Sequence, residues 1–412
     1  MKNFLAHTDE IRNEMLKEIS CASIDDLFKQ IPVKFKDFNL YNPKSEMETQ
    51  KEIKKLAKNN KTEYANFLGG GVYNKFIPAC INYVAQRFEF LTAYTPYQPE
   101  ISQGTLQIIY EYQTMISRLT GMDIANASMY DGGSACAEAI LMSHRIAKGK
   151  KNKALVSNYL NPEYKQVIKT YTWAQDIEIE WFDEIPKNTS EYCCVLVQYP
   201  DYYGEINQLN KPDTLFIVCA NLSALAVICP PVEADIVVGD IQSLGIPMNF
   251  GGPHAGYMAC KEAYMRQMPG RLVGRTLDAE GEQAFTLTIQ TREQHIKREK
   301  ATSNICSNQS LIALATTLYL SLLGEKGFKE ANIISANMAH ALSKMLNGKG
   351  VRTMNKNFFN EFVVEVEDSD KYLAKLKEAN ILGGIKLDDR RVLVCATEMN
   401  TEEEILDYIE AL

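Results

Sequence analysis

The chain has 412 residues, of which 46% are hydrophobic and 23% are charged. This composition is typical of a globular protein and excludes disorder, collagen or a coiled coil as a description of the whole chain. The length predicts one large domain with a smaller companion, enough for an enzyme. The 44 Lys and Arg against 52 Asp and Glu give a net charge of -8, which opposes non-specific binding to nucleic acid or anionic lipid. We therefore expect a soluble protein without a nucleic-acid or membrane partner.

The cysteines and the N-terminal segment predict a cytoplasmic protein. The ten cysteines lie mostly inside apolar runs and form no C-x-x-C pair, so we expect buried free thiols in a reducing compartment. The N-terminal segment carries Asp9 and Glu10 and lacks the apolar core of a signal peptide. The one long uncharged stretch, residues 214–232, contains two adjacent prolines and fits two buried strands better than a membrane helix. The five histidines indicate no metal site.

Residues 1–90 are predicted to form a helical extension with a glycine-rich loop. Helices are expected to about residue 20, over residues 23–29 and over residues 45–58, before the three glycines at 69–71. Two prolines predict an extended segment over residues 90–104. An amphipathic pattern predicts a long helix from about residue 102 to residue 119, ended by Gly121.

Residues 91–325 are predicted to form a large α/β domain, and residues 326–412 a small α+β domain. Short, nearly continuous apolar strands that alternate with helices indicate a mostly parallel sheet covered on both faces. The expected strands span residues 125–129, 153–157, 177–182, 193–198, 215–220, 225–228, 235–238 and 256–260, with helices over 134–148 and 162–174. The last section is expected to contain helices over 311–323, 328–346, 370–379 and from 401, and strands over 361–366 and 391–395.

A turn that leads into a helix is the first candidate for a binding site. Gly132, Gly133 and Ser134 stand where a strand ends and the helix begins, so free backbone N–H groups and the helix dipole could hold a phosphate there. The alternative is that Ser134 or Asp131 is a simple N-cap.

About a hundred residues further on, a strand leads into GDIQSLGIPMNFGGPHAGYMACK. Together with the glycine turn and the small last domain, this order resembles the fold-type I pyridoxal-phosphate enzymes. When Asp235 and Pro247 are laid on the corresponding residues of that superfamily, Ser243 and its neighbour Gln242 occupy the place of the cofactor lysine and the residue before it. Asn221 stands near the place of the Asp that pairs with the pyridine nitrogen, and an amide cannot form that ion pair. We therefore expect no catalytic residue in this pocket.

Four longer blocks carry a more specific resemblance. ANFLGGGVYNKFIPA, TAYTPYQPEISQG, ADIVVGDIQSLGIPMNFGGPHAGYMAC and TREQHIKREKATSNICSNQSL are similar to the P-protein (glycine decarboxylase) of the glycine cleavage system. Within that family they resemble subunit 1, the N-terminal half of the two-subunit form, and the resemblance covers essentially the whole chain. It implies a fold-type I chain whose own site has decayed, so that Gly132 to Ser134 form a degenerate phosphate loop.

The resemblance also implies partners and an activity. Subunit 2 would carry the pyridoxal phosphate, and two copies of each subunit would form a heterotetramer. The complex, a glycine dehydrogenase of the oxidoreductase class, would decarboxylate glycine and pass the aminomethyl group to the lipoyl group of the H-protein. The chain would be inactive alone and would complete the partner's substrate channel.

Eight residues are candidates for the shared site or its interface. They come from the two N-terminal loops and from the TREQHIKREKATSN block, where His295, Arg298 and Lys300 could meet a carboxylate or a cofactor phosphate. The candidates are Asn74, Thr95, Tyr97, Gln98, Ser102, His295, Lys300 and Thr302. For each of them the alternative is a solvated surface.

Two other functions remain open from the sequence. The chain could be a stand-alone pseudo-enzyme that acts as a scaffold or regulatory binding protein. It could also be a pyridoxal-phosphate enzyme that uses an unexpected lysine, such as Lys261, Lys297 or Lys300, although the fold places none of them to reach the cofactor.

Overall fold

The computed structural model describes residues 7–32, 42–91 and 95–412. The chain divides into two compact units, Met1–Thr62 and Glu63–Leu412. This division falls before the predicted boundary at residue 90, and the predicted large and small domains both lie within the second unit. The boundaries 91–325 and 326–412 stay predictions.

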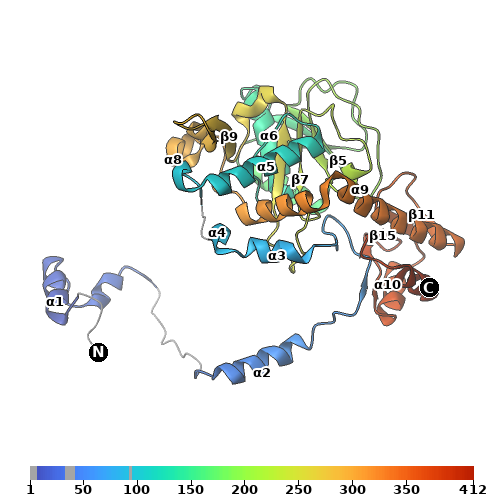
Figure 1. The fold of residues 1–412 in the computed structure, drawn as a ribbon, viewed down its shortest axis with the longest axis horizontal. Helices are drawn as coiled ribbons and strands as arrows, with labels where there is room; N and C mark the ends of the chain where they lie inside the picture. Colours follow the sequence, from blue (N-terminus) through green and yellow to red (C-terminus); the bar gives the residue numbers. More distant parts are fainter. Residues whose placement is uncertain (1–6, 33–41, 92–94) are drawn as a thin grey trace. The chain divides into compact units, whose positions relative to one another are not determined.

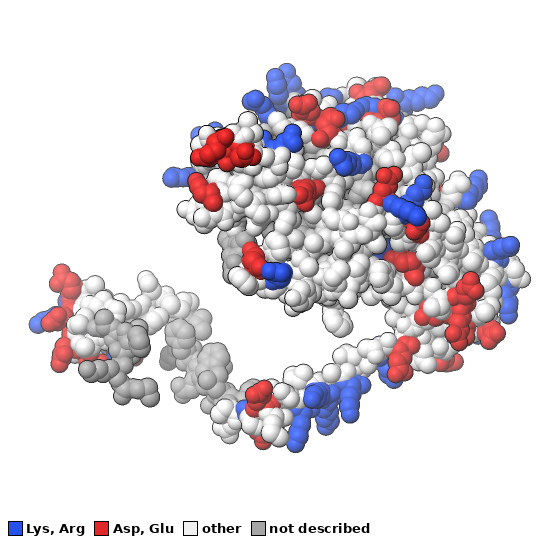
Figure 2. Space-filling model, viewed as in Figure 1, with Lys and Arg blue, Asp and Glu red and all other residues white. Residues whose placement is uncertain are grey.

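The first unit contains the helical part of the predicted extension, whereas the glycine-rich loop of that extension lies in the second unit. It comprises α1 (Asp9–Glu18), the 3-10 turn η1 (Ile24–Phe28) and α2 (Glu46–Ala57). Ser45 and Glu48 form a capping box at the start of α2, the signature that favours a helix start there. The predicted helix over residues 23–29 is a single 3-10 turn. No residue within these three elements is buried, and Figure 2 shows lysine side chains gathered along α2.

The second unit is built on a seven-stranded sheet. Its spatial order is β2 (Ile124–Ala125), β8 (Gly256–Cys260), β7 (Ile236–Asp240), β6 (Leu215–Ala220), β5 (Cys194–Tyr199), β3 (Lys153–Ser157) and β4 (Glu178–Phe182). The strands from β3 to β7 run parallel, and β8 is antiparallel to both of its neighbours. The mostly parallel sheet predicted from the apolar runs is confirmed.

Helices cover both faces of this sheet (Figure 1). Alternate residues of one strand point to opposite faces: Phe216 and Val218 pack with α5 (Gln103–Thr120) and the first half of α9 (Ser310–Gly348), whereas Ile217 and Cys219 pack with α6 (Gly132–Ile146) and α7 (Pro162–Trp173). Both faces are therefore dry, which explains why the strands are apolar throughout.

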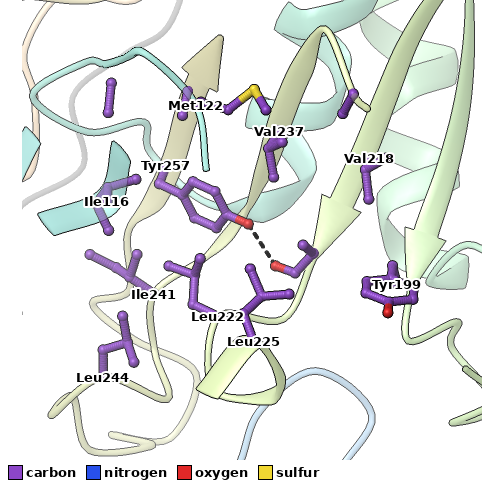
Figure 3. Close-up of a cluster of buried hydrophobic side chains, with 14 of the residues drawn as sticks. Ile116, Met122, Tyr199, Val218, Leu222, Leu225, Val237, Ile241, Leu244 and Tyr257 are labelled. Carbon is purple, nitrogen blue, oxygen red and sulfur yellow. Dashed lines mark hydrogen bonds between the residues drawn. The ribbon is translucent and has the colours of Figure 1, made fainter. Parts of the chain in front are cut away.

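The first of these clusters contains a buried tyrosine (Figure 3). The hydroxyl of Tyr257 donates a hydrogen bond of 2.7 Å to the carbonyl oxygen of Ala220, at the end of β6. This bond satisfies a polar group inside an otherwise apolar layer and fixes β8 against the end of β6.

The small sheet near the C-terminus has the order β11 (Arg352–Thr353), β12 (Glu361–Glu365), β15 (Arg391–Cys395) and β14 (Ile385–Lys386), all antiparallel. It packs with α10 (Ser369–Glu378), α11 (Glu402–Glu410) and the second half of α9. Beside it, β1 (Ala65–Asn66) pairs in parallel with β13 (Ile381–Leu382). Residues 65–66 thus lie beside a strand of the C-terminal part of the chain.

Helix α9 packs against both the seven-stranded sheet and the small C-terminal sheet. Its two predicted halves are continuous except at Gly324, whose φ of 59° is not helical. The helix is long and apolar enough to cross a membrane by length and composition, but 44% of its apolar window is buried within the protein. We interpret it as a core helix, because Ala313 and Tyr319 are among its fully covered residues.

Three predictions of local structure were wrong, and one hairpin was missed. The expected strand over residues 125–129 is reduced to β2, Ile124–Ala125, and an isolated bridge at Met129. The expected strand over residues 225–228 is a 3-10 turn, Ala224–Ala226, because the Asn221 side chain accepts from the Ser223 N–H and starts a turn. The expected extended segment over 90–104 includes the end of α4 (Phe88–Leu91) and the turn η2 (Pro99–Ile101), while residues 92–94 lie outside the described residues. The hairpin of β9 (Leu272–Leu277) and β10 (Gln283–Thr288) was missed, because its outer residues are polar.

The cysteines are all free, as expected. Six of them are buried, but Cys80, Cys229 and Cys306 are exposed, so the expectation of burial was wrong for these three.

A buried ion pair connects the loop of residues 67–77 to α9 and to the turn after β15. The side chains of Lys75 and Glu398 are 1% and 6% exposed, and their charged atoms are 2.6 Å apart. The Lys75 ammonium also donates to Ser335 (2.9 Å) and Asn332 (3.1 Å), so all three of its protons have acceptors. Glu398 accepts in addition from the Phe76 N–H at 2.9 Å.

We expect Lys75→Met to destabilise the chain by about 3–5 kcal/mol, because it leaves the Glu398 charge buried and unpaired. The measurement is the urea midpoint followed by circular dichroism. Lys326→Met is the control, since Lys326 and Glu330 are 3.8 Å apart and mostly exposed, and such pairs contribute about 1 kcal/mol or less. Equal shifts in the two variants would contradict the assignment.

Candidate functional site

The predicted remnant of a cofactor pocket lies at the carboxyl ends of β5, β6 and β7. The structure places Gln242 and Ser243 there, beside a cavity of about 40 Å³, which has room for a few water molecules at most. The other lining residues are Gly71, Tyr73, Asn161, Tyr164, Gln198, Cys219, Ala220, Asn221, Gly239 and Asp240.

The side chain of Gln242 is fully engaged. Its carbonyl oxygen accepts from the Tyr73 N–H at 2.8 Å, and its amide nitrogen donates to the carbonyls of Tyr73 (2.9 Å) and Ile246 (2.8 Å). The neighbouring Ser243 hydroxyl accepts from the Ser223 hydroxyl at 2.9 Å. Gln242 therefore holds Tyr73, in the loop of residues 67–77, against the pocket, whereas Ser243 is bonded to the turn that follows β6.

The backbone N–H groups at the start of α6 are bonded to carboxylates of the chain itself. Asp131 accepts from the Ser134 N–H at 2.7 Å, and Asp240 accepts from the Gly132 N–H at 3.2 Å. The Tyr164 hydroxyl lies so close that a Cβ atom on Gly132 would be 2.3 Å from it. The simpler alternative, an N-cap at Asp131 and Ser134, is what the structure shows.

These residues do not fit pyridoxal phosphate. Pockets for ligands of that size measure some hundreds of Å³, and two carboxylates face the place where its phosphate would lie, which would be repelled by them. Among the described residues, none of those that line the cavity is a lysine. The described part of the chain also contains no group of three or more His, Cys, Asp or Glu that could hold a metal ion.

Two carboxyl groups near the loop of residues 67–77 are withdrawn from solvent: Asp240 lines the cavity and is partly buried, and Glu361 is buried beside Tyr73. Burial raises the pKa of Asp240 to about 6 and the pKa of Glu361 to about 7. Glu361 accepts from the hydroxyl of Tyr73 at 2.8 Å and from the N–H of Gly70. The protein thus favours the protonated form of both groups more than the unfolded chain does.

We expect the free energy of unfolding to fall as the pH rises from about 5 to 8. A carboxyl whose pKa is raised in the folded state contributes stability below its unfolded pKa of about 4, and that contribution is lost as the pH passes the folded value, by up to about 3 kcal/mol for each group. Asp240→Asn and Glu361→Gln, measured by urea unfolding at each pH, should flatten the fall. The exposed Glu410→Gln should leave it unchanged, and a flat wild-type profile would contradict the assignment.

A second cluster brings together two of the predicted shared-site residues. The rings of Tyr97 and His295 have centroids 5.3 Å apart and meet edge to face. Both side chains are partly exposed, and the nearby Thr95 hydroxyl is buried without a hydrogen-bond partner.

The remaining candidates are not part of this contact. Gln98 and Lys300 are exposed, Ser102 precedes α5, and Thr302 donates its N–H to the Arg292 carbonyl at 3.0 Å. Asn74 borders a different cavity of about 450 Å³, together with residues 246–250. The roles of all eight residues stay predictions.

Two residues that the sequence did not single out lie behind Tyr97 and His295. Arg271 is 3% exposed, and its guanidinium donates to the Tyr97 hydroxyl at 3.0 Å and to Asn308 at 3.4 Å. The Glu293 side chain is 8% exposed, and one of its oxygens lies 3.6 Å from both Arg271 Nε and His295 Nδ1. A charged residue within the apolar run MPGRLVG was the signal that could have indicated Arg271.

Comparison with known proteins identifies the family. A family model described as the glycine cleavage system P-protein matches residues 2–412. The chain belongs to the glycine cleavage system P-protein family. Helix α6, the filled pocket and the Tyr97 and His295 cluster all fall within the matched range.

Relatives in two genera cover the whole chain. A protein of Geobacillus thermodenitrificans (strain NG80-2), named probable glycine dehydrogenase (decarboxylating) subunit 1, is 46% identical over 447 residues, covering 100% of this chain and 99% of its own. A protein of the same name from Bacillus cereus (strain B4264) is 44% identical, with coverage of 98% and 97%.

Solved structures agree with the fold of this P-protein family member. The crystal structure of a glycine decarboxylase (P-protein) of the glycine cleavage system, in inhibitor-bound form, superimposes with a TM-score of 0.87 at 40% identity and covers 99% of both chains. A sphingosine-1-phosphate lyase of Burkholderia pseudomallei K96243 gives a TM-score of 0.63 at 13% identity over 93% of both chains, which concerns the fold alone. The predicted α/β architecture of fold-type I is confirmed.

Proposed function

We propose that the chain is the subunit of glycine decarboxylase that carries no cofactor. With subunit 2 it decarboxylates glycine and transfers the aminomethyl group to the lipoyl group of the H-protein. The observation that carries the proposal is the filled pocket. In a member of this family, Gln242 and Ser243 stand at the expected lysine position. Gln242 is bonded to Tyr73 and Ser243 to Ser223, so both side chains are engaged within the chain itself. The pyridoxal phosphate then belongs to subunit 2.

The proposed assembly contains two copies of each subunit and works in the cytoplasm. Pyridoxal phosphate on subunit 2 supplies the electron sink for the loss of carbon dioxide. This chain provides one wall of the shared site, and Tyr97 and His295 are the candidates that its own structure places together. The names of the relatives, each a subunit 1, support the need for a partner.

The two other functions are not favoured. An unexpected lysine at position 261 is disfavoured by geometry. The Lys261 ammonium lies 3.3 Å from Asp235, which comes just before β7, whereas the pocket lies at the other end of that strand. No described feature of the pocket favours a scaffold that acts alone.

We expect the purified chain to show neither the visible absorbance of a lysine-bound pyridoxal phosphate nor glycine-dependent exchange of carbon dioxide. Subunit 2 should bind the cofactor, and the exchange should appear only when both subunits are mixed. The measurements are the absorption spectrum and the incorporation of labelled carbon dioxide into glycine. Cofactor absorbance in this chain alone would refute the proposal, as would full exchange activity in subunit 2 alone.

A matched variant tests the pocket itself. Ser243→Ala removes the hydroxyl at the lysine position, and we expect the activity of the mixed subunits to stay at the wild-type value. The measurement is the same exchange assay, with thermal unfolding to verify folding. A sharp loss of activity in a folded variant would show that the pocket takes part in the reaction.

A further inference from the structure

The cluster behind Tyr97 and His295 contains two opposite charges, Arg271 and Glu293, that are 3% and 8% exposed. Arg271 and Glu293 are both buried, although a buried ion pair is often no more stable than apolar residues of the same volume. Their contact is loose: the closest atoms are 3.6 Å apart, and Arg271 Nε and Glu293 Oε1 have no hydrogen-bond partner. Buried polar atoms without partners are uncommon in folded proteins, and a catalytic role is one of the explanations for them.

Hydrogen-bond chemistry fixes what the Tyr97 hydroxyl can do. A guanidinium has donors only, so the Tyr97 oxygen accepts the hydrogen bond of 3.0 Å from Arg271. The guanidinium carbon also lies 5.3 Å from the centre of the Tyr97 ring. The phenolic proton is therefore directed away from Arg271, on a residue that is 45% exposed.

The same reasoning applies to His295. The Glu293 carboxylate faces His295 Nδ1 at 3.6 Å, and an ionised carboxylate can only accept. This contact is longer than a hydrogen bond, but the nearby negative charge favours the ring tautomer that carries its proton on Nδ1 and leaves Nε2 as an acceptor. Contacts of catalytic groups are often long in the absence of the substrate and shorten in the complex.

We propose that Arg271 and Glu293 are positioning residues for the reaction of the complete enzyme: Arg271 orients the Tyr97 hydroxyl, and Glu293 orients the His295 ring, toward the site shared with subunit 2. The proposal rests on the proposed function. The three segments involved lie far apart in the chain, around residues 97, 271 and 293–295, and the cluster brings them within hydrogen-bond or ion-pair range.

The test of Arg271 is a double-mutant cycle in the mixed two-subunit enzyme. Arg271→Lys keeps the positive charge beside Glu293 but loses the planar guanidinium group that donates to the Tyr97 hydroxyl. Arg271→Lys and Tyr97→Phe should each lower kcat/KM for glycine by about 10- to 100-fold. Because Arg271 acts through Tyr97, the double variant should be no worse than Tyr97→Phe alone.

The test of Glu293 uses chemical rescue. His295→Gly should lose activity and recover part of it when free imidazole is added, because the small base can occupy the vacated place. With Glu293→Gln in the same chain the recovery should be weaker, because the group that orients the ring is lost. A purely structural role would give no recovery in either variant.

Arg292→Lys is the matched control. Arg292 is an adjacent buried arginine, 8% exposed, that donates to the backbone carbonyls of Ile289 (3.1 Å) and Gly270 (3.0 Å). Its replacement should lower the thermal unfolding temperature and leave kcat/KM unchanged.

Two results would overturn the proposal. One is Arg271→Lys with a lowered unfolding temperature but a wild-type kcat/KM, as expected for Arg292→Lys. The other is a double variant in which the losses of Arg271→Lys and Tyr97→Phe multiply. If the wild-type subunits show no exchange when mixed, the proposed function fails, and the proposal fails with it; failure of the proposal alone leaves the wild-type exchange intact.

Discussion

The loop of residues 67–77 must satisfy its backbone polar groups inside the protein, and much of the structure follows from how it does so. Buried N–H and C=O groups need partners, and here side chains from both sheets supply them. Gln242 bonds both backbone groups of Tyr73, and Glu361 accepts from the Gly70 N–H. The other partners are Asn161 to Gly70, Thr397 to Asn74 and Glu398 to Phe76.

The glycines of this loop are a consequence of that close fit. A Cβ atom on Gly69 would lie 2.1 Å from a carboxylate oxygen of Glu361, and Gly70 and Gly71 have φ values of 75° and 105°. Only glycine adopts these conformations without cost. The loop in turn fills the space beside Gln242 and Ser243, so the same contacts that join the two sheets also close the pocket.

With the pocket closed, we propose that the functional groups of this chain lie elsewhere. The described residues around Tyr97 and His295 combine partly exposed polar rings with the buried charges of Arg271 and Glu293. We therefore assign the pocket to folding and to the expected pH dependence of stability, and propose this surface cluster as the part of the chain that contributes to a partner's chemistry.

The sequence predicted those elements whose pattern depends on burial alone. Apolar runs identified β3 to β8 because both faces of the sheet are covered, and Gly121 marked the end of α5 with its φ of 71°. The turn at Ala224–Ala226 and the β9–β10 hairpin were missed because an Asn side chain and polar outer residues decide them locally. The sequence pattern also predicted the helices α1 and α2, although the structure buries none of their residues.

The sequence by itself determined that no lysine stands at positions 242 and 243. The order of strands and turns can be recognised in the sequence, and the residues at those positions can then be read without coordinates. Only the tertiary structure decided that Asp240 and Tyr164 close the start of α6, and that Arg271 and Glu293 stand behind Tyr97 and His295. The physical reason is distance along the chain: Tyr97 and Arg271 are separated by 174 residues, and a hydrogen bond between such positions depends on the packing of β9, α5 and the loops around them, which no local pattern records.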